Sequence, residues 1–436
     1  MAKIGIIGAG VAGLAAAVDL KRANHEVTIF EADERVGGLA AGFKDDNWDW
    51  HLEKFYHHWF ETDTHLLKFA EELGLRHKIF FPRPKTSYWI NGKIYRSEIS
   101  PSALLLPVSI VGKVRLGLVG AYLKLTQNWR ALEKFTADEW LRRYMGQDVY
   151  ETLWKPLLIG KFGKDYQQVN MAWFWARIHS RSLRLGTYQG GFQGFLDDVA
   201  QYVTEQGVEI RLKTPIQAIS RQDNGQLVLQ SPTDSEAFDA VLATTSPKLL
   251  LKLAPYIEGE YAQKVKALRS IGAVVVIYAL RHKLLTDGTY WLNLPAKSPH
   301  KADNPFPFLA LVEHTNFLSS EHYGGDNLVY CGDYIAPDHE YFQLSETTLA
   351  ERFAKSLATF NPQFKADWIR KWWVFRAPYA QPVPPVCHSE NIPDLRTPQR
   401  GLYWASMSQV YPWDRGTNFA VEIGRRAAAL MLEDIK

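Results

Sequence analysis

The start of the chain contains a strand, a glycine-rich turn, a helix and a second strand in direct succession. Residues 4–7 (IGII) form an apolar run of the length of a buried parallel strand, and they lead directly into the GxGxxG turn of residues 8–13 (GAGVAG). An Ala-rich helix is expected over residues 14–22 and a second strand over residues 26–30. This order predicts a βαβ unit, so the chain is expected to build an α/β fold around a parallel sheet.

The glycines of this turn are typical of a dinucleotide-binding site. Gly8 permits a tight turn, Gly10 lets the backbone approach a pyrophosphate, and Gly13 lets the helix pack closely on the strand. Unpaired N–H groups and the positive end of the helix then face the phosphates. Glu31, at the end of the second strand, can accept hydrogen bonds from both ribose hydroxyls and would repel a 2′-phosphate, which argues against NADP.

The residues after Glu31 distinguish FAD from NAD. Residues 31–38 (EADERVGG) add a second glycine pair, Gly37 and Gly38. Here the sequence resembles the superfamily of flavin amine oxidases, protoporphyrinogen oxidases and phytoene desaturases, which are FAD-dependent oxidoreductases. The resemblance implies that FAD is the cofactor and that the second glycine pair lies along the flavin pyrophosphate and ribityl chain. The sequence departs from many members in carrying Leu39 where they have Arg or Thr.

Two later segments extend the resemblance. Ile216 occupies the position whose backbone meets the adenine in the superfamily, and the C-terminal segment has a strand at residues 401–405 followed by a helix from about Thr417. The superfamily points the N-terminus of this helix at the flavin, where the positive helix end stabilises negative charge on the reduced ring. Thr417 and Asn418 are suitable N-caps. Residues 406–407 are Ser-Met where many members have Gly-Asp, so the side-chain contacts of that pair are not carried over.

The resemblance also implies two interleaved domains. A Rossmann-like FAD-binding domain is expected to combine residues 1–80, 189–268 and 396–436. An α+β substrate-binding domain is expected to combine residues 81–188 and 269–395.

The residues expected to contact FAD come from all three segments of the first domain. They are Gly8, Ala9, Gly10, Val11, Ala12, Gly13, Glu31, Ala32, Gly37, Gly38, Leu39, Ile216, Met407, Thr417, Asn418 and Phe419.

Residues 48–60 are rich in Trp, His and Tyr, and in the superfamily this stretch returns beneath the flavin. Tyr56 and His57 are the expected flavin-side residues, with His57 as a ring contact or a proton shuttle. The alternative is that the histidines are hydrogen-bonded members of an aromatic loop. A metal site at His57 and His58 is not expected, because adjacent residues rarely converge on one ion and no third ligand is evident. Arg415 is the third candidate catalytic residue, since its loop precedes the flavin-facing helix.

Three arginines recur at helical spacing and are candidates for substrate binding. Arg177, Arg181 and Arg184 stand at i, i+4 and i+7, so on one helix they would form one face. If that face lines the cavity, Arg177 and Arg181 suit a phosphate or carboxylate of the substrate. The alternative is a solvated surface stripe. Tyr411 is a further predicted substrate contact; its loop lacks the aromatic pair that encloses the amine in typical amine oxidases.

The overall composition excludes several classes of protein. A net charge of +3 is too small to indicate nucleic-acid binding. Two cysteines without CxxC spacing indicate neither a disulfide framework nor a thiolate metal site and fit a cytoplasmic protein. The chain enters a strand at once, so no signal peptide is expected, and no long uncharged apolar run predicts a membrane-spanning helix.

Residues 100–125 combine an apolar face with the cations Lys113, Arg115 and Lys124. This pattern suits a helix at a membrane interface, so peripheral contact with the inner face of a membrane is one interpretation. An ordinary buried helix is the other.

The sequence thus predicts an FAD-dependent dehydrogenase, oxidase or desaturase acting on a bulky, partly apolar small molecule, either lipid-like or anionic. One alternative is a redox-neutral flavin enzyme similar to UDP-galactopyranose mutase. Another is a non-enzymatic escort similar to Rab GDP-dissociation inhibitors, against which the intact phosphate-binding glycines argue.

Overall fold

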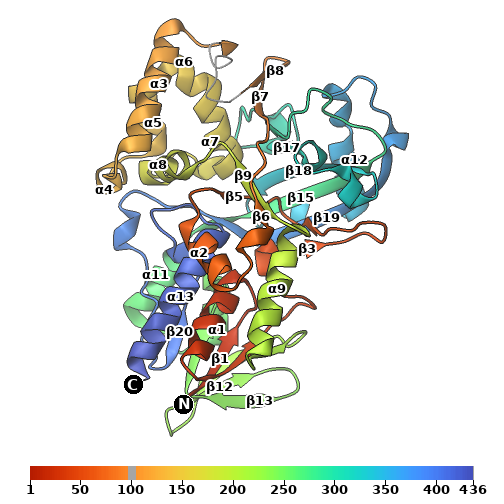
Figure 1. Cartoon of the computed structure of the whole chain (residues 1–436). Coiled ribbons are helices and arrows are strands. Elements are labelled where there is room, and N and C mark those ends of the chain that lie inside the picture. The colour runs from red at the N-terminus through yellow and green to blue at the C-terminus, as the bar shows by residue number, and fades with distance from the viewer. Residues whose placement is uncertain (97–104, 436) are drawn as a thin grey trace.

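A parallel sheet organises the part of the molecule in which both ends of the chain lie (Figure 1). The computed structural model describes residues 1–96 and 105–435. All strand pairs of this sheet are parallel, and its strands come from each of the three segments predicted to form the FAD-binding domain. In spatial order, the five strands are β10 (Glu209–Arg211), β2 (Glu26–Phe30), β1 (Lys3–Ile7), β14 (Ala240–Ala243) and β20 (Leu402–Trp404). The predicted α/β fold is therefore confirmed.

Both faces of the parallel sheet are covered, which explains why its strands are apolar throughout. Ile4 and Ile6 face a helical layer, whereas Ile7 and Val241 face a small antiparallel sheet. The helical layer consists of α1 (Val11–Arg22), α2 (Thr64–Glu72), α9 (Gly191–Glu205) and α13 (Thr417–Asp434). The opposite layer consists of β11 (Ala218–Arg221), β12 (Leu227–Gln230), β13 (Ser235–Phe238), α10 (Pro247–Leu253) and α11 (Gly259–Ala267).

A second, mainly antiparallel sheet lies at the upper right in Figure 1. Its only parallel pairing among the described residues joins β16 to β7. In spatial order, its strands are β19 (Ile369–Pro382), β15 (Ser270–Leu280), β18 (Asn327–Ile335), β17 (Ala310–Glu313), β16 (Trp291–Asn293), β7 (Thr86–Ile90) and β8 (Lys93–Arg96). Helix α12 (Glu346–Ala354) packs on β19 and β15.

A cluster of helices forms the upper left of the molecule in Figure 1, and we call it the helical lobe. Its helices are α3 (Ile110–Leu125), α4 (Trp129–Leu132), α5 (Ala137–Met145), α6 (Gln147–Val149), α7 (Lys155–Phe162) and α8 (Met171–Ser180). A π-helical turn, Tyr150–Trp154, joins α6 to α7. Of the predicted interfacial segment, residues 100–104 lie outside the described residues.

Short strands connect these parts. Strand β3 (Gly42–Phe43) pairs with β4 (Leu52–Glu53). Strand β9 (Leu185–Tyr188), which follows the helical lobe in the chain, pairs with β5 (Trp59–Phe60) and β6 (Ile79–Phe80). The segment carrying Tyr56 and His57 is thereby held next to the helical lobe.

Glycines determine where two helices begin. Helix α1 was expected from residue 14 but begins at Val11, because Gly10 already serves as its N-cap. Helix α9 begins at Gly191, after Gly190 in the left-handed conformation with φ of 87°. Asn91 and Gly92, both at positive φ, form the hairpin turn between β7 and β8.

A buried carboxyl group, Glu53, joins β4 to the start of α9. Its Oε1 accepts a hydrogen bond of 2.9 Å from the N–H of Phe192, and the side chain is 4% exposed. Burial raises its pKa from the ordinary value of 4.5 to about 7. Because folding raises this pKa, the contribution of Glu53 to stability is fully present below pH 4.5 and is lost as the pH rises to 7.

Glu53→Gln is therefore expected to be more stable than the wild type at pH 8 by roughly 1–3 kcal/mol and to lose this advantage at pH 5. The amide keeps an acceptor for Phe192 N–H but has no charge to desolvate. Chemical denaturation at both pH values measures the difference. Other buried carboxyl groups titrate in the same way in both proteins, so their contributions cancel in the comparison. An equal gain in stability at pH 5 and pH 8 would therefore contradict the raised pKa of Glu53.

Candidate functional site

The glycine turn ends in a helix N-terminus with open space in front of it. Gly10 is the N-cap of α1, makes no side-chain cap and has nothing within 4 Å of where a Cβ would stand. At Gly13, by contrast, a Cβ would stand 2.1 Å from the carbonyl oxygen of Gly8, so this glycine is needed for close packing. The first-turn N–H groups of α1 lie between these positions and have no acceptor within the helix.

Glu31 lies beside the glycine turn, at the end of β2. Its Oε2 accepts a hydrogen bond of 2.7 Å from Ala9 N–H, and its Oε1 accepts one of 2.9 Å from Asp33 N–H. Each carboxylate oxygen retains a further lone pair, which a ribose hydroxyl can use. The N–H of Thr214 donates to the Glu31 carbonyl at 2.8 Å, which brings the loop of Ile216 to the same edge of the sheet.

The second glycine pair runs alongside the first turn. Gly37 N–H donates to the Ala9 carbonyl at 2.9 Å, and Gly10 and Gly37 form a parallel bridge. Gly37 and Gly38 have φ values of 124° and 56°, in the region that favours glycine. Two motifs separated in sequence therefore form one continuous strip of bare backbone. Leu39, after the pair, packs near Ala273 and Ala377 of the second sheet.

The C-terminal helix presents a second glycine-capped N-terminus. Gly416, not Thr417 or Asn418, precedes α13, and the first helical hydrogen bond runs from Ala420 N–H to the Gly416 carbonyl. The predicted side-chain caps are wrong because both side chains have other partners. Thr417 accepts a hydrogen bond from the Trp59 indole at 2.6 Å, and Asn418 accepts one from Leu66 N–H at 3.0 Å.

These contacts anchor α13 to Trp59 and to α2, and they leave its first N–H groups without intrahelical acceptors. Gly416 also has nothing within 4 Å of a Cβ position. Phe419, in the first turn, stacks on Trp413 with ring centroids 5.6 Å apart and an interplanar angle of 8°.

The residues present fit a flavin dinucleotide. One helix N-terminus with unpaired donors suits the pyrophosphate in the middle of such a molecule, and the other suits negative charge on the reduced flavin ring at one end. The glycine strip beside Gly10 offers backbone without side chains. Ala12 and Gly424 set the distance between the helices, since a Cβ at Gly424 would stand 2.2 Å from the Ala12 carbonyl oxygen. Helices α1 and α13 thus cross at van der Waals contact.

Tyr56 and His57 lie in an aromatic wall between the two sheets. The Tyr56 ring meets Trp291 edge to face at 4.7 Å, and burial raises the pKa of its phenol well above the ordinary value. His57 Nδ1–H donates to the Phe55 carbonyl at 2.5 Å. Burial, with the nearby charge of Arg415, lowers the pKa of His57 to about 4, so its imidazole is neutral at pH 7 and Nε2 is left as an acceptor.

Arg415 lies opposite this wall. Its guanidinium Nη2 donates to the Tyr334 hydroxyl at 2.5 Å, and its Nε is buried with no hydrogen-bond partner among the described residues. The same Tyr334 ring carries a second cation, because the Lys161 amine stands 4.5 Å from the ring centroid. Lys161 is only 9% exposed, and burial lowers the pKa of its amine well below the ordinary value.

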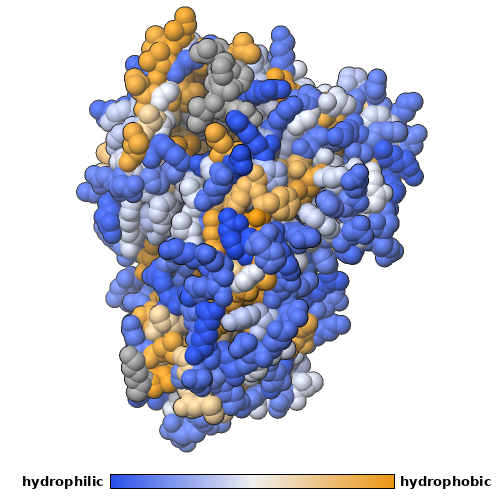
Figure 2. Space-filling view, in the orientation of Figure 1, coloured by the Kyte–Doolittle hydropathy of each residue, from blue (hydrophilic) through white to orange (hydrophobic). Residues whose placement is uncertain are grey.

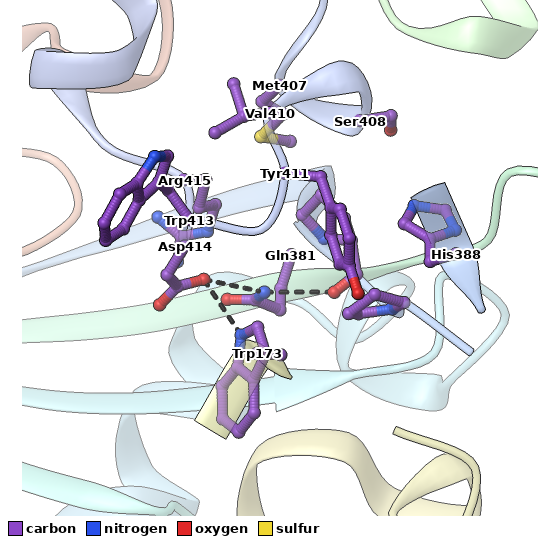
Figure 3. A pocket seen from close by; sticks show the side chains of 12 residues that line it. Trp173, Gln381, His388, Met407, Ser408, Val410, Tyr411, Trp413, Asp414 and Arg415 are labelled. Carbon is purple, nitrogen blue, oxygen red and sulfur yellow. Dashed lines mark hydrogen bonds between the residues drawn. The ribbon is translucent and has the colours of Figure 1, made fainter. Parts of the chain in front are cut away.

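Arg177 connects α8 to the loop before α13. Its guanidinium forms an ion pair of 2.5 Å with Asp414, whose other oxygen accepts a hydrogen bond of 3.1 Å from the Trp173 indole. Figure 3 shows Asp414 pointing toward Trp173 and Gln381, with the neighbouring Arg415 on the same loop. Despite its own burial, Asp414 has a pKa well below its usual range, since Lys161 and the two arginines favour the carboxylate.

The predicted helical stripe of arginines is wrong in part. Helix α8 ends at Ser180, and Arg181 has the extended backbone angles of −64° and 132°, so Arg181 and Arg184 lie beyond the helix. Water reaches the Arg181 side chain, yet desolvation by surrounding protein and the charge of Arg177 lower its pKa to about 10. The charge of Arg177 contributes to this shift, so the two guanidinium groups lie near each other.

Met407 and Tyr411 line a small pocket beneath this loop (Figure 3). Its cavity of about 10 Å³ has room for about one water molecule, so it is no ligand site in itself. The Tyr411 hydroxyl donates to Glu133 at 2.9 Å and accepts from Asn170 at 3.0 Å. These bonds tie the loop to the helical lobe.

Lys161, Tyr334 and Asp414 were not among the predicted site residues. No spacing in the sequence shows that α7 and β18 meet over the loop before α13, so only the tertiary structure brings these side chains together. We call Lys161, Arg177, Arg181 and Arg415 the cation cluster. Within residues 1–96 and 105–435, no group of three or more His, Cys, Asp or Glu side chains could hold a metal ion.

Comparisons with known proteins agree with this architecture. A family described as flavin containing amine oxidoreductase matches residues 11–432. Coproporphyrinogen III oxidase of Staphylococcus aureus is 25% identical over 288 residues, which cover 57% of this chain and 61% of that protein. The 15-cis-phytoene desaturase of Solanum lycopersicum is 23% identical over 477 residues, which cover 99% of this chain and 78% of that protein. The solved structure of cyclohexylamine oxidase from Brevibacterium oxydans has a TM-score of 0.72 at 17% identity and covers 100% of this chain and 99% of its own.

The fold and the glycine-lined site fit the class of proteins that bind a dinucleotide at a βαβ unit. The chain belongs to the family of flavin containing amine oxidoreductases, whose profile matches almost its whole length. The predicted superfamily is thereby confirmed, and a flavin is the cofactor that the family description implies. The chain spans less than two thirds of the Staphylococcus aureus relative and about a third of protoporphyrinogen oxidase 2 of Arabidopsis thaliana.

Proposed function

We propose that this protein is an FAD-dependent oxidoreductase that takes a hydride from a bulky, partly apolar small molecule. The observation that carries the proposal is the strip of bare backbone formed by Gly10 and Gly37, together with two helix N-termini capped by glycine, at Gly10 and Gly416. A bound FAD would supply the hydride acceptor. Glu31 would hold the ribose, and the first turn of α1 would hold the pyrophosphate.

The remaining residues position the substrate and exclude water. Tyr56 and Trp291 meet edge to face and are backed by the buried Tyr330, so these two rings can present apolar surface to a ring-bearing molecule. His57, neutral at pH 7, can hold or accept a proton at Nε2. The names of the relatives support an apolar substrate, since they refer to porphyrinogens and phytoene.

Anaerobic titration tests the proposal. The purified protein is mixed with candidate porphyrinogens, carotenoid precursors and amines while the flavin absorbance is followed. Bleaching that reverses when an electron acceptor is added is expected for the oxidoreductase. Bleaching only with external reductant, followed by turnover that consumes no acceptor, would favour the redox-neutral alternative. A protein that takes up no flavin would contradict the proposal and favour an escort.

We further propose that the protein is cytoplasmic and docks on the inner face of a membrane through the exposed side of α3. Six large side chains of this helix are exposed at spacings that put them on one side: Ile110, Val111, Val114, Leu118, Tyr122 and Leu125. Figure 2 shows apolar side chains gathered at this tip of the helical lobe. The helix carries three cations and no carboxylate, which favours an anionic lipid surface.

No helix in the described part of the chain is long and apolar enough to cross a bilayer, so the proposed contact is peripheral. Helix α3 is also fixed to the cation cluster region, because Lys124 donates to the carbonyls of His179 and Arg181 at 2.7 and 2.8 Å. A membrane-bound α3 would therefore lie beside the C-terminal end of α8.

The triple variant Ile110→Gln, Leu118→Gln, Leu125→Gln is expected to lower binding to vesicles that contain phosphatidylglycerol at least tenfold, since it removes three apolar anchors. Flotation measures the bound fraction. Leu249→Gln, at an exposed leucine of α10, is the control and is expected to bind as the wild type does. Wild-type protein that stays entirely in the soluble fraction would contradict docking.

A further inference from the structure

A ligand-sized cavity lies where the chain crosses between the two sheets, and we call it the crossing cavity. The chain passes from α11, which covers the parallel sheet, into β15 of the second sheet, and it returns from β19 to β20. The two crossings run side by side, since Val383 N–H donates to the Arg269 carbonyl at 2.9 Å. The cavity beside them has a volume of about 240 Å³. Sites for drug-sized ligands have volumes of about 300–1,000 Å³, so the crossing cavity suits a smaller molecule.

The walls of the crossing cavity come from three parts of the fold. They are Gln168 from the connection between α7 and α8, Lys264 and Ala267 from the end of α11, and Leu268, Arg269, Val383, Pro385, His388 and Asn391 from the two crossings. Among these described residues, two are cations, none is a carboxylate and four have apolar side chains. Such a lining suits a molecule that combines negative charge with a small apolar part.

His388 is the buried polar group of this lining. Its side chain is 6% exposed, and its Nδ1 is buried with no hydrogen-bond partner among the described residues. Burial lowers the pKa of His388 to about 4, so its ring is neutral at pH 7. The ring meets Tyr411 edge to face at 5.1 Å (Figure 3). An unpaired buried polar group is costly, and a ligand oxygen is the kind of partner that removes this cost.

The two cations of the lining can bind an added anion. Lys264 pairs at 3.0 Å with Glu260 on the same helix, and the Glu260 side chain is 81% exposed. Exposed pairs contribute little to stability, so an anion in the cavity can replace Glu260. Arg269 is held more firmly, because its guanidinium binds Asp165 and donates to Gln168 at 2.6 Å. These bonds fix the guanidinium at the wall and leave some of its five N–H donors available.

We propose that the crossing cavity is a second ligand site, which binds a small molecule with a carboxylate or phosphate group on an apolar body. Lys264 and Arg269 bind the anionic oxygens, and His388 hydrogen-bonds to the same group. Leu268 and Val383 contact the apolar body. None of these residues belongs to the proposed flavin and substrate site, so this site goes beyond the proposed function and does not depend on it.

Benzoate, phenyl phosphate and benzamide test the proposal on the purified protein with its cofactor. Benzoate and benzamide have the same ring and nearly the same size, but only benzoate is charged at pH 7. Titration calorimetry is expected to show benzoate or phenyl phosphate binding at least tenfold more tightly than benzamide, because the anions form charge-assisted hydrogen bonds. The tighter of the two anions shows which acidic group the site prefers. If neither anion binds more tightly than benzamide, the proposal is overturned.

Lys264→Gln tests whether the anion binds in the crossing cavity. It is expected to weaken binding of the tighter anion about tenfold and to leave benzamide binding unchanged, because it removes one charge-assisted contact. Lys266→Gln is the matched control, since Lys266 is exposed on the same helix and does not line the cavity. Equal losses in the two variants, or no loss in either, would overturn the proposal.

Two further variants distinguish this site from the cation cluster. His388→Phe keeps an aromatic ring but has no ring nitrogen, and it is expected to weaken anion binding about threefold to tenfold. Arg181→Gln is expected to bind the anion as the wild type does. A loss in Arg181→Gln without a loss in Lys264→Gln would place the anion at the cation cluster and overturn the proposal. Flavin content and flavin bleaching are measured separately, so a failure of the proposed function leaves this result readable.

Discussion

Gly10→Val is expected to fold normally and to lose flavin, with an affinity lowered about hundredfold or more, which is ~2.7 kcal/mol or more. The backbone at Gly10 has φ of −74°, which any residue adopts, and the Cβ would enter empty space. That space is where a pyrophosphate must approach the N-terminus of α1. The measurement is flavin absorbance per mole of protein, together with the thermal midpoint of the apoprotein.

Gly13→Ala is expected to lower the stability of the protein, in contrast to Gly10→Val, which is expected to lower its affinity for flavin. The comparison separates a packing glycine from a ligand-facing one. The Cβ added at Gly13 would stand 2.1 Å from the Gly8 carbonyl oxygen, so the strand and helix must separate, at a cost of about 3 kcal/mol. Gly117→Ala, in open space on α3, is the neutral control. Full flavin content in Gly10→Val would show that no phosphate lies at this turn.

Asp414→Asn is expected to destabilise the protein by about 2–4 kcal/mol, because it leaves the surrounding cations without their one carboxylate. Asp414 pairs with Arg177 and accepts from Trp173, and its side chain is 20% exposed. The amide keeps the shape but not the charge. Urea denaturation at pH 7 measures the loss, and Asp338→Asn, at an exposed carboxylate, is expected to change stability by less than about 0.5 kcal/mol.

The same variant separates the charge from the packing. Adding Arg177→Gln to Asp414→Asn is expected to restore part of the lost stability, because it removes one of the unbalanced cations. If the double variant loses more free energy of unfolding than the two single variants lose together, this account of Asp414 is contradicted.

Local sequence patterns predicted the elements that carry the dinucleotide site. The turn of residues 8–13 and the position of Glu31 depend on neighbours in the chain, and the structure has both where the patterns indicated. The helix at the C-terminus was also predicted almost to the residue. Its cap was not, because the partners of Thr417 and Asn418, Trp59 and Leu66, are far away in sequence.

The substrate side of the site depends on long-range packing, which explains what the sequence did not reveal. Arg177 and Arg181 were candidates by spacing, but the helix ends between them. Nothing in the sequence distinguishes Lys161 from the other lysines. Only the tertiary structure brings its amine next to the rings of Tyr334 and Trp173. Tyr411 was a predicted substrate contact, and the structure engages its hydroxyl with Glu133 and Asn170; its role toward a substrate stays a prediction.

The nucleotide released from the purified protein tests the central claim most directly. Denatured protein is analysed by chromatography and mass spectrometry, and the amount released is compared with the amount of chain. The glycine strip at Gly10 and Gly37 predicts one FAD per chain, released in full from the wild type and absent from Gly10→Val. Release of NAD or FMN instead, or of no nucleotide after incubation with FAD, would contradict it.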